Sequence, residues 1–294
     1  MKAKSRRSGT GEKAREKSQR ILGLELGGGK SGRTSLVLLE YYPKDKKVFV
    51  SERVPNVAAT ATRYGDEVLL DHLRKLKPAR IGVNAPLSLP PCVRCRYPEC
   101  GGYRECSYAP VRWMHEEAVR AKIPVLKHPT PYTQRPVDVF LRTRVQPRYG
   151  IDLFIEESLG AGRAPLAARM QYLQSQIGKK LFLETSPRLA LVGIADWYGV
   201  TARELRRYRL PEDGVEHRRH ILVKLQEDLT AFGLPQLFLY EAEAQEIAES
   251  LPCFQALLSG FMVVCADAGF LRDRDPDFEK SWSFVAIPRP RAEW

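Results

Sequence analysis

The chain has 294 residues, of which 44% are hydrophobic and 28% are charged, and its formal net charge is +12. This composition is typical of a soluble globular protein, and the length is sufficient for one large α/β domain or two small ones. No apolar run reaches transmembrane length, and no apolar core follows the basic N-terminus, which argues against a membrane protein and a secretory signal. We therefore expect a cytoplasmic protein.

Half of the positive charge lies at the N-terminus. Residues 1–20 contain eight Lys or Arg and two Glu, a net charge of +6, which leaves +6 for the rest of the chain. This pattern predicts a disordered basic tail over 1–20. Such an arm suits nucleic acid, although it could equally be a tail that only aids solubility.

Hydrophobic periodicity predicts alternating strands and helices after the tail. Three early strands form an antiparallel meander, and a helix leads into a fourth strand that prolines cut off. The predicted strands are 21–26, 35–42, 47–54, a short one beginning at Ile81, 180–184 and 281–287. The predicted helices are 66–77, 111–122, 137–143, 165–177, 201–208, 216–232 and 252–265.

The glycine-rich turn over 27–34 invites comparison with a phosphate-binding loop. That loop needs a glycine ahead of Gly29-Lys30-Ser31, but the chain has Leu24 or Glu25 there. The turn is also followed by a predicted strand rather than a helix, so we exclude a phosphate-binding loop here.

An RNase H-like sheet has this order of elements: three strands, a crossover helix and then a fourth strand. We therefore predict an α/β fold with an RNase H-like mixed sheet, antiparallel and then parallel, flanked by helices. Since no clean linker follows the tail, we predict one domain over 21–294 with a cysteine-rich insertion at 91–110.

Four cysteines crowd into this insertion: Cys92, Cys95, Cys100 and Cys106. In a cytosolic chain they argue for a metal rather than for disulfides. Four thiolates satisfy a structural zinc site, and an iron–sulfur cluster uses the same ligands. We expect zinc first, with His115 close enough to replace one sulfur. Cys253 and Cys265 lie in an apolar helix and are expected to be buried thiols.

Polar residues end three of the predicted strands. Glu25 interrupts the first, Asn84 follows the fourth, and Glu184 ends the fifth. Ligands of open α/β sheets bind at the carboxyl ends of strands, and an unpartnered buried carboxylate is costly. We therefore expect these three residues to form a site.

Five short motifs keep a fixed order along most of residues 20–290. They are Leu24-Glu25, Val83-Asn84-Ala85-Pro86-Leu87, Arg135-Pro136-Val137-Asp138 with Leu141-Arg142, Glu184-Thr185-Ser186-Pro187, and Gln255-Ala256-Leu257-Leu258-Ser259. Together with a closing segment at Trp282 they resemble the domain-of-unknown-function family numbered 429. That family is predicted to consist of nucleases with an RNase H-like fold.

The resemblance implies catalytic positions at Glu25, Asn84, Glu184 and Gln255, where the family has four acids. Only Glu184 matches in kind, Glu25 is a longer acid, and the two amides have lost their charge. Two Mg²⁺ or Mn²⁺ ions bring four positive charges against two carboxylates. Amide oxygens ligate hard cations more weakly, so the set suits one ion better than the two of phosphodiester hydrolysis.

Candidate substrate contacts are Lys30, Arg33, Arg135 and Asp138. A second cationic cluster consists of Arg203, Arg206, Arg207, Arg209, Arg218 and Arg219 with Tyr208, and it suits either phosphate binding or a solvated helix face.

Our leading hypothesis is an RNase H-like protein acting on nucleic acid, a metal-dependent nuclease with a partly degenerate site. The alternative is a catalytically inactive nucleic-acid-binding or scaffold protein with a structural metal. The third is an actin-like phosphotransferase, which would need a second glycine-rich hairpin that the sequence lacks.

Overall fold

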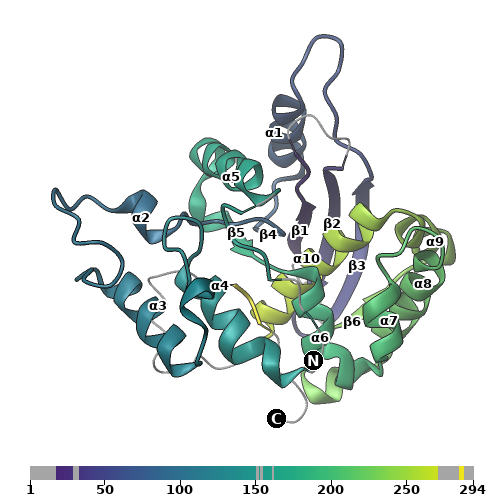
Figure 1. Ribbon diagram of the computed structural model, residues 1–294. Coiled ribbons are helices and arrows are strands. Elements are labelled where there is room, and N and C mark those ends of the chain that lie inside the picture. The colour runs from purple at the N-terminus through teal and green to yellow at the C-terminus, as the bar shows by residue number, and fades with distance from the viewer. Residues whose placement is uncertain are drawn as a thin grey trace, which may run out of the picture.

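The computed structural model describes residues 18–28, 33–149, 152, 155–160, 162–270 and 285–287. Six strands in this part of the chain form one sheet in the order β5-β4-β1-β2-β3-β6 (Figure 1). The strands are β1 Gln19–Glu25, β2 Ser35–Tyr42, β3 Lys47–Val54, β4 Arg80–Val83, β5 Phe182–Glu184 and β6 Gln236–Phe238.

The sheet is mixed, as predicted. β2 runs antiparallel to both β1 and β3, whereas β4 is parallel to β1, β5 to β4 and β6 to β3. In the register, Leu24 pairs with Val83 and Val83 with Glu184. The carboxyl ends of β1, β4 and β5 therefore meet at one edge of the sheet.

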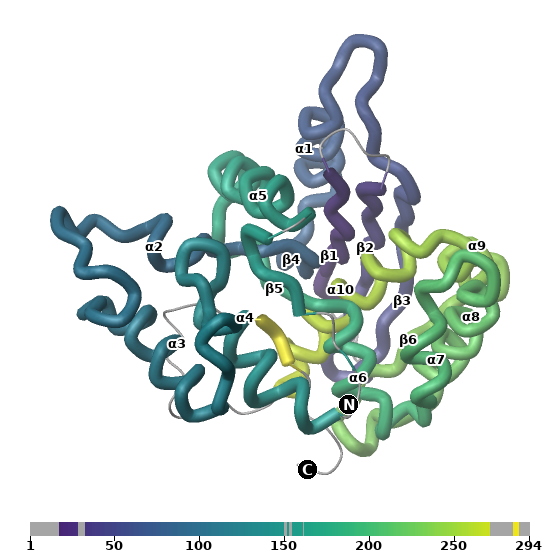
Figure 2. Tube along the Cα trace, viewed as in Figure 1, coloured from purple at the N-terminus to yellow at the C-terminus, as the bar shows by residue number. Residues whose placement is uncertain are grey.

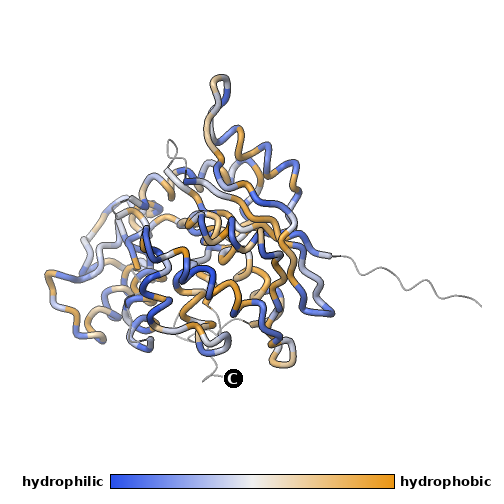
Figure 3. The backbone as a smooth tube through the Cα atoms, turned by 90° about the vertical axis from the view of Figure 1, so that its right-hand side faces the viewer, coloured by the Kyte–Doolittle hydropathy of each residue, from blue (hydrophilic) through white to orange (hydrophobic). Residues whose placement is uncertain are grey.

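Alternating side chains give the sheet two apolar faces. Leu22, Leu24 and Val83 face one side and pack in a core with α1 and α5, while Ile21 and Leu39 face the other and pack with α6 and α10. Hydrophobic segments consequently run through the middle of the molecule in Figure 3. Both faces of the sheet are covered by helices, as an α/β fold requires.

Helices connect these strands and cover the sheet. α1 crosses from β3 to β4, and a long excursion of helices separates β4 from β5. They are α1 Gly65–Leu76, α2 Pro91–Arg94, α3 Ala109–Arg120, α4 Pro136–Phe140, α5 Arg163–Ile177, α6 Pro187–Tyr198, α7 Ala202–Arg207, α8 Gly214–Leu225, α9 Glu241–Glu249 and α10 Leu251–Asp267. Short turns of other helix types lie at Val125–Lys127, Leu141–Val145, Gln146–Arg148, Lys179–Leu181 and Thr230–Phe232.

α10 lies across β1, β2 and β4, and it touches the backbones of β1 and β4. A methyl group added at Gly23 would lie 1.8 Å from the Ala256 carbonyl oxygen, and one added at Gly82 would lie 2.1 Å from that of Ser259. Only glycine fits at these two crossings. The close approach brings Gln255 of α10 to the sheet edge where β1 ends.

Several boundaries differ from the sequence prediction. β1 begins at Gln19, inside the predicted tail, because Gln19 and Arg20 pair with β2. The predicted helix over 216–232 ends at Leu225 and resumes only as one tight turn. Of the predicted closing strand, 281–284 lie outside the described residues. Residues 285–287 form no regular strand, although the Ala286 amide donates to the Glu184 carbonyl.

Within the described residues, no single helix is long and apolar enough to cross a membrane. Only α9 and α10 together reach the required length, and they are bent by 113° with respect to each other.

Candidate functional site

The three polar strand ends lie at the same edge of the sheet. Glu25 is the last residue of β1, Asn84 directly follows β4, and Glu184 is the last residue of β5. The Asn84 amide donates to the Leu24 carbonyl at 3.2 Å, and the Thr185 amide donates to the Val83 carbonyl at 2.9 Å. Backbone pairing thus continues one residue past β4 and fixes these ends side by side.

A cavity of about 380 Å³ opens at this edge, and we call it the arginine pocket. Glu25, Asn84 and Gln255 line it, so three of the four positions implied by the family resemblance converge. The rest of its lining is Glu156, Arg163, Leu166, Ser186, Pro187, Arg188, Tyr208 and Arg209.

Glu25 is held by its neighbour on the next strand. The Asn84 side-chain amide donates to both carboxylate oxygens, at 3.0 and 3.3 Å. Burial nevertheless raises the Glu25 pKa from its ordinary 4.5 to about 7, against the lowering effect of Asn84, Arg163 and Arg209. Glu25 can therefore exchange a proton near neutral pH, as a general acid or base must.

Glu25→Gln should stabilise the protein at alkaline pH. Because the folded-state pKa is raised, the folded protein binds more protons than the unfolded chain between about pH 4.5 and 7, and stability falls as pH rises through that window. The glutamine variant lacks this loss. We expect the difference between its free energy of unfolding in EDTA and the wild-type value to be about 1–2 kcal/mol larger at pH 8 than at pH 5.

Urea denaturation at both pH values measures this difference. An equal difference at pH 5 and pH 8 would show that Glu25 keeps an ordinary pKa.

Tyr208 closes the inner wall of the arginine pocket. Its side chain is fully buried, and its hydroxyl makes no hydrogen bond of good geometry, although Gln255 lies beside it. Burial raises the Tyr208 pKa to about 12, so the hydroxyl stays protonated and can donate. A buried hydroxyl without an acceptor is costly, which suggests that something else satisfies it.

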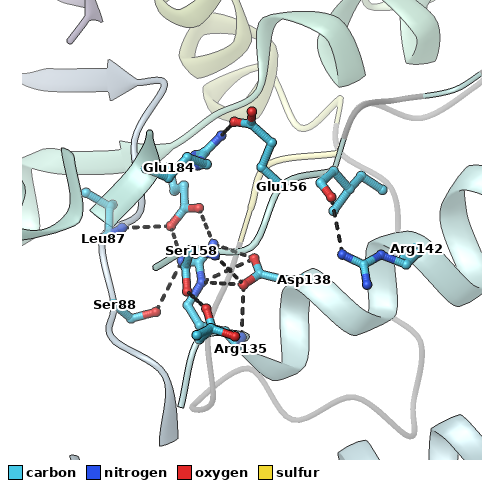
Figure 4. Close-up of polar contacts among 11 residues, drawn as sticks. Leu87, Ser88, Arg135, Asp138, Arg142, Glu156, Ser158 and Glu184 are labelled. Carbon is cyan, nitrogen blue, oxygen red and sulfur yellow. Dashed lines mark hydrogen bonds and ion pairs between the residues drawn. The ribbon is translucent and has the colours of Figure 1, made fainter. Parts of the chain in front are cut away.

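Glu184 lines an adjoining cavity rather than the arginine pocket. The Arg135 guanidinium holds both of its carboxylate oxygens at 2.7 Å and also donates to Asp138 at 2.7 Å (Figure 4). The Leu87 amide donates to Glu184 at 2.8 Å. Arg135, Asp138 and Glu184 are all at most 3% exposed, so this cluster, which we call the Arg135 cluster, is a buried ion network.

The Arg135 cluster changes the expectation for two predicted substrate contacts. Arg135 and Asp138 face each other and Glu184 inside the protein. Burial lowers the Arg135 pKa, but the charges and hydrogen bonds of Asp138 and Glu184 outweigh it and raise that pKa above its usual range. Asp138 also accepts from the backbone amides of Arg135 and Ser158. The geometry fits a role in holding the site together better than contact with a substrate.

These residues do not fit a two-metal centre. Both oxygens of Glu184 are engaged by Arg135, which it shares with Asp138, and Asn84 and Gln255 carry no charge. Glu25 is the other carboxyl group among the four positions, and burial raises its pKa to about 7 against the effect of Arg163 and Arg209. Asp267, the single acid of α10, is paired with Arg80 at the opposite end of β4. Two divalent ions would need more negative charge than this.

The other cationic residues predicted to contact a substrate differ in how exposed they are. Lys30 lies outside the described residues, and Arg33 is exposed. In the second cationic cluster, Arg218 is buried and donates to the carbonyl oxygens of Ala248 and Tyr208. That cluster is therefore not one surface, and Arg209 with Tyr208 belongs to the arginine pocket.

The four cysteines of the insertion lie in a segment that projects from the body around α2 (Figure 2). They are neighbours, because the pKa of Cys92 is raised by burial and then by Cys106, Cys95 and Cys100. Across the described residues, no group of three or more His, Cys, Asp or Glu side chains has the geometry of a metal site. The predicted zinc or iron–sulfur site, including the role of His115, stays a prediction from spacing.

Purified protein should contain about one zinc, or several irons, per chain, since four thiolates in one short segment suit either. Elemental analysis measures this, and Cys92→Ser with Cys95→Ser should remove the metal. Metal-free protein of unchanged stability would refute the prediction.

Sequence reasoning missed Arg163 and the pocket role of Arg188. Arg188 lies in the first turn of α6, a helix that begins with the Ser186 cap and Pro187. Ser-Pro before an apolar run is a recognisable helix start and could have placed Arg188 at the site. Arg163 begins α5 and reaches the pocket only through tertiary folding.

A comparison of the chain with family models, with curated proteins and with solved structures finds no match. The resemblance to family 429 therefore remains a hypothesis carried by its motifs.

Proposed function

We propose that this chain is an RNase H-like protein that binds nucleic acid at the arginine pocket without a two-metal centre. The strand order supports the fold assignment. β3-β2-β1-β4-β5, with an antiparallel first half and a parallel second half, follows an RNase H-like sheet, and β6 adds a strand beyond β3. The site lies where such sheets bind ligands, at the carboxyl ends of central strands.

The observation that carries the proposal is the charge of the pocket. Arg163, Arg188 and Arg209 line it, whereas Glu25 and Glu156 are its carboxylates. Burial favours the protonated form of Glu25, and Glu156 is exposed and lies 3.8 Å from Arg163. An excess of guanidinium groups attracts phosphate, which arginine binds with two parallel hydrogen bonds.

Metal-dependent nuclease activity is the second candidate, and the position of Glu25 favours it. A carboxylate that ends the central strand beside Asn84 and Gln255 could hold one Mg²⁺ or Mn²⁺ ion through oxygen ligands. The actin-like phosphotransferase gains no support, because the described residues form one sheet rather than a duplicated pair.

The proposal is tested with labelled single-stranded, duplex and branched DNA and RNA. In EDTA we expect at least one of these to bind, with an affinity that falls as salt rises. With Mg²⁺ or Mn²⁺ added, we expect no cleavage. Absence of binding to all of them would overturn the proposal, and cleavage that Glu25→Gln abolishes would favour the second candidate.

Restoring the lost charges should create a metal site. Asn84→Asp with Gln255→Asp adds two carboxylates to the pocket that already holds Glu25. We expect Mg²⁺ affinity to rise at least about tenfold, because carboxylates bind hard cations more strongly than amides do. Calorimetric titration with Mg²⁺ measures this, and Asn84→Ala with Gln255→Ala is the control. Equal affinity in the wild type and the acidic variant would contradict the charge argument.

A further inference from the structure

We propose that the arginine pocket binds a terminal phosphate monoester of the nucleic acid, which the three arginines hold and the Tyr208 hydroxyl hydrogen-bonds. This inference rests on the proposed function and narrows it from nucleic acid in general to a phosphorylated chain end. It begins from the Tyr208 hydroxyl, a fully buried donor that makes no well-formed hydrogen bond, although Gln255 lies beside it, and that belongs to a residue lining the pocket.

Tyr198 shows what a satisfied buried tyrosine looks like in the same chain. It is also fully buried, but its hydroxyl donates to the Pro235 carbonyl at 2.7 Å. Tyr208 instead lines a cavity of about 380 Å³, which is ample room for a phosphate group. Since Tyr208 remains protonated, it would donate to a phosphate oxygen.

The cations come from three separate segments. Arg163 begins α5, Arg188 lies in the first turn of α6, and Arg209 follows α7. Their electrostatic effects overlap, because Arg163 and Arg209 both act on Glu25, and Arg209 acts on Arg188. The first turn of α6 adds the positive end of a 12-residue helix. Burial lowers the Arg188 pKa, and the negative charge of Asp152, which does not line the pocket, partly offsets this.

This charge suits a monoester better than an internal phosphodiester. A phosphate monoester carries about 1.5–2 negative charges at pH 7, whereas each phosphate within a strand carries one. The lining has three guanidinium groups and two carboxyl groups: Glu25, whose burial favours its neutral form, and Glu156, which is exposed. The excess positive charge of the lining therefore complements the dianion of a chain end.

The test uses one internally labelled oligonucleotide with a 5′-phosphate, a 3′-phosphate or no terminal phosphate. Fluorescence anisotropy with the full chain in EDTA gives the three affinities. We expect one phosphorylated form to bind about tenfold more tightly than the unphosphorylated one, the effect of adding charged hydrogen bonds. Arg209→Gln should remove most of this preference, and Arg74→Gln, which removes an exposed arginine from α1, should keep it.

Tyr208→Phe separates ligand binding from folding. Its Tm should stay close to that of the wild type, because the free protein loses only the poorly aligned contact with Gln255, while the preference for the phosphorylated end falls about tenfold. Tyr198→Phe should do the reverse, lowering the Tm and keeping the preference. A Tyr208→Phe variant with a lower Tm and an unchanged preference would overturn the role of Tyr208.

The failure of this inference can be distinguished from that of the proposed function. Equal affinity for all three oligonucleotides would overturn the inference and leave nucleic-acid binding standing. If none of them binds, the proposed function fails. Nucleoside 5′- and 3′-monophosphates then test whether the pocket binds phosphate at all. A thermal shift that Arg209→Gln abolishes would support a phosphate site, and no shift would overturn it.

Discussion

Replacing Arg135 by methionine should destabilise the protein by about 3–5 kcal/mol, the cost of removing one partner from a buried ion network. Glu184 and Asp138 are each 3% exposed and would be left facing each other without a cation. Urea denaturation measures the loss. Arg142→Met is the matched control, because Arg142 is half-buried on the following turn and makes one weak bond to the Ile155 carbonyl.

The loss should depend on pH in a defined direction. Without Arg135, burial and mutual repulsion raise the pKa of both acids. As pH falls, protonation of these acids removes the repulsion and stabilises the variant. We expect the difference from the wild type to shrink between pH 7 and pH 5. A loss below about 1 kcal/mol at pH 7 would show that Glu184 reaches water, and that it could still serve a metal ion.

Gly23→Ala should be similarly severe, about 3 kcal/mol or more, because its methyl group meets backbone that cannot move aside. The contacts are the Ala256 carbonyl oxygen at 1.8 Å and the Gly260 nitrogen at 2.7 Å, both on α10. To accept the methyl, α10 must move away from β1 and carry Gln255 with it. The arginine pocket should therefore lose ligand affinity along with stability.

Gly162→Ala is the control for Gly23→Ala, because nothing lies within 4 Å of its added methyl and its φ is −77°. Unfolding free energy and oligonucleotide affinity are measured together. If Gly23→Ala fails to fold, Gly23→Ser and Gly82→Ala should fail likewise. A stable Gly23→Ala variant would show that α10 does not approach the sheet as closely as described.

The regular part of the fold is readable from the sequence because its signals are local. β2 and β3 begin and end at the predicted residues, since alternating apolar residues between turn signals define both ends. α6 was missed because its residues are apolar nearly all round, which removes the helical period. β6 is only three residues long and offers too short a pattern.

The site was predictable in its positions and not in its partners. Strand order alone places Glu25 and Asn84 side by side, because both end neighbouring parallel strands. Arg135 and Glu184 are 49 residues apart in the chain, and no local pattern reveals that they pair. The same holds for Arg218, which looks like a surface cation in the sequence and lies buried against two carbonyl groups.

The most direct test of the account is to count the divalent ions that the site binds. Mn²⁺ is titrated into the wild-type protein with its bound oligonucleotide, and free Mn²⁺ is followed by electron paramagnetic resonance, with Glu25→Gln as the reference. Since the arginine pocket offers one carboxylate at the strand ends and Glu184 is held by Arg135, we expect no pair of tightly bound ions and the same titration curve for both proteins. Two Mn²⁺ ions per chain that disappear in Glu25→Gln would contradict the account and establish a two-metal centre.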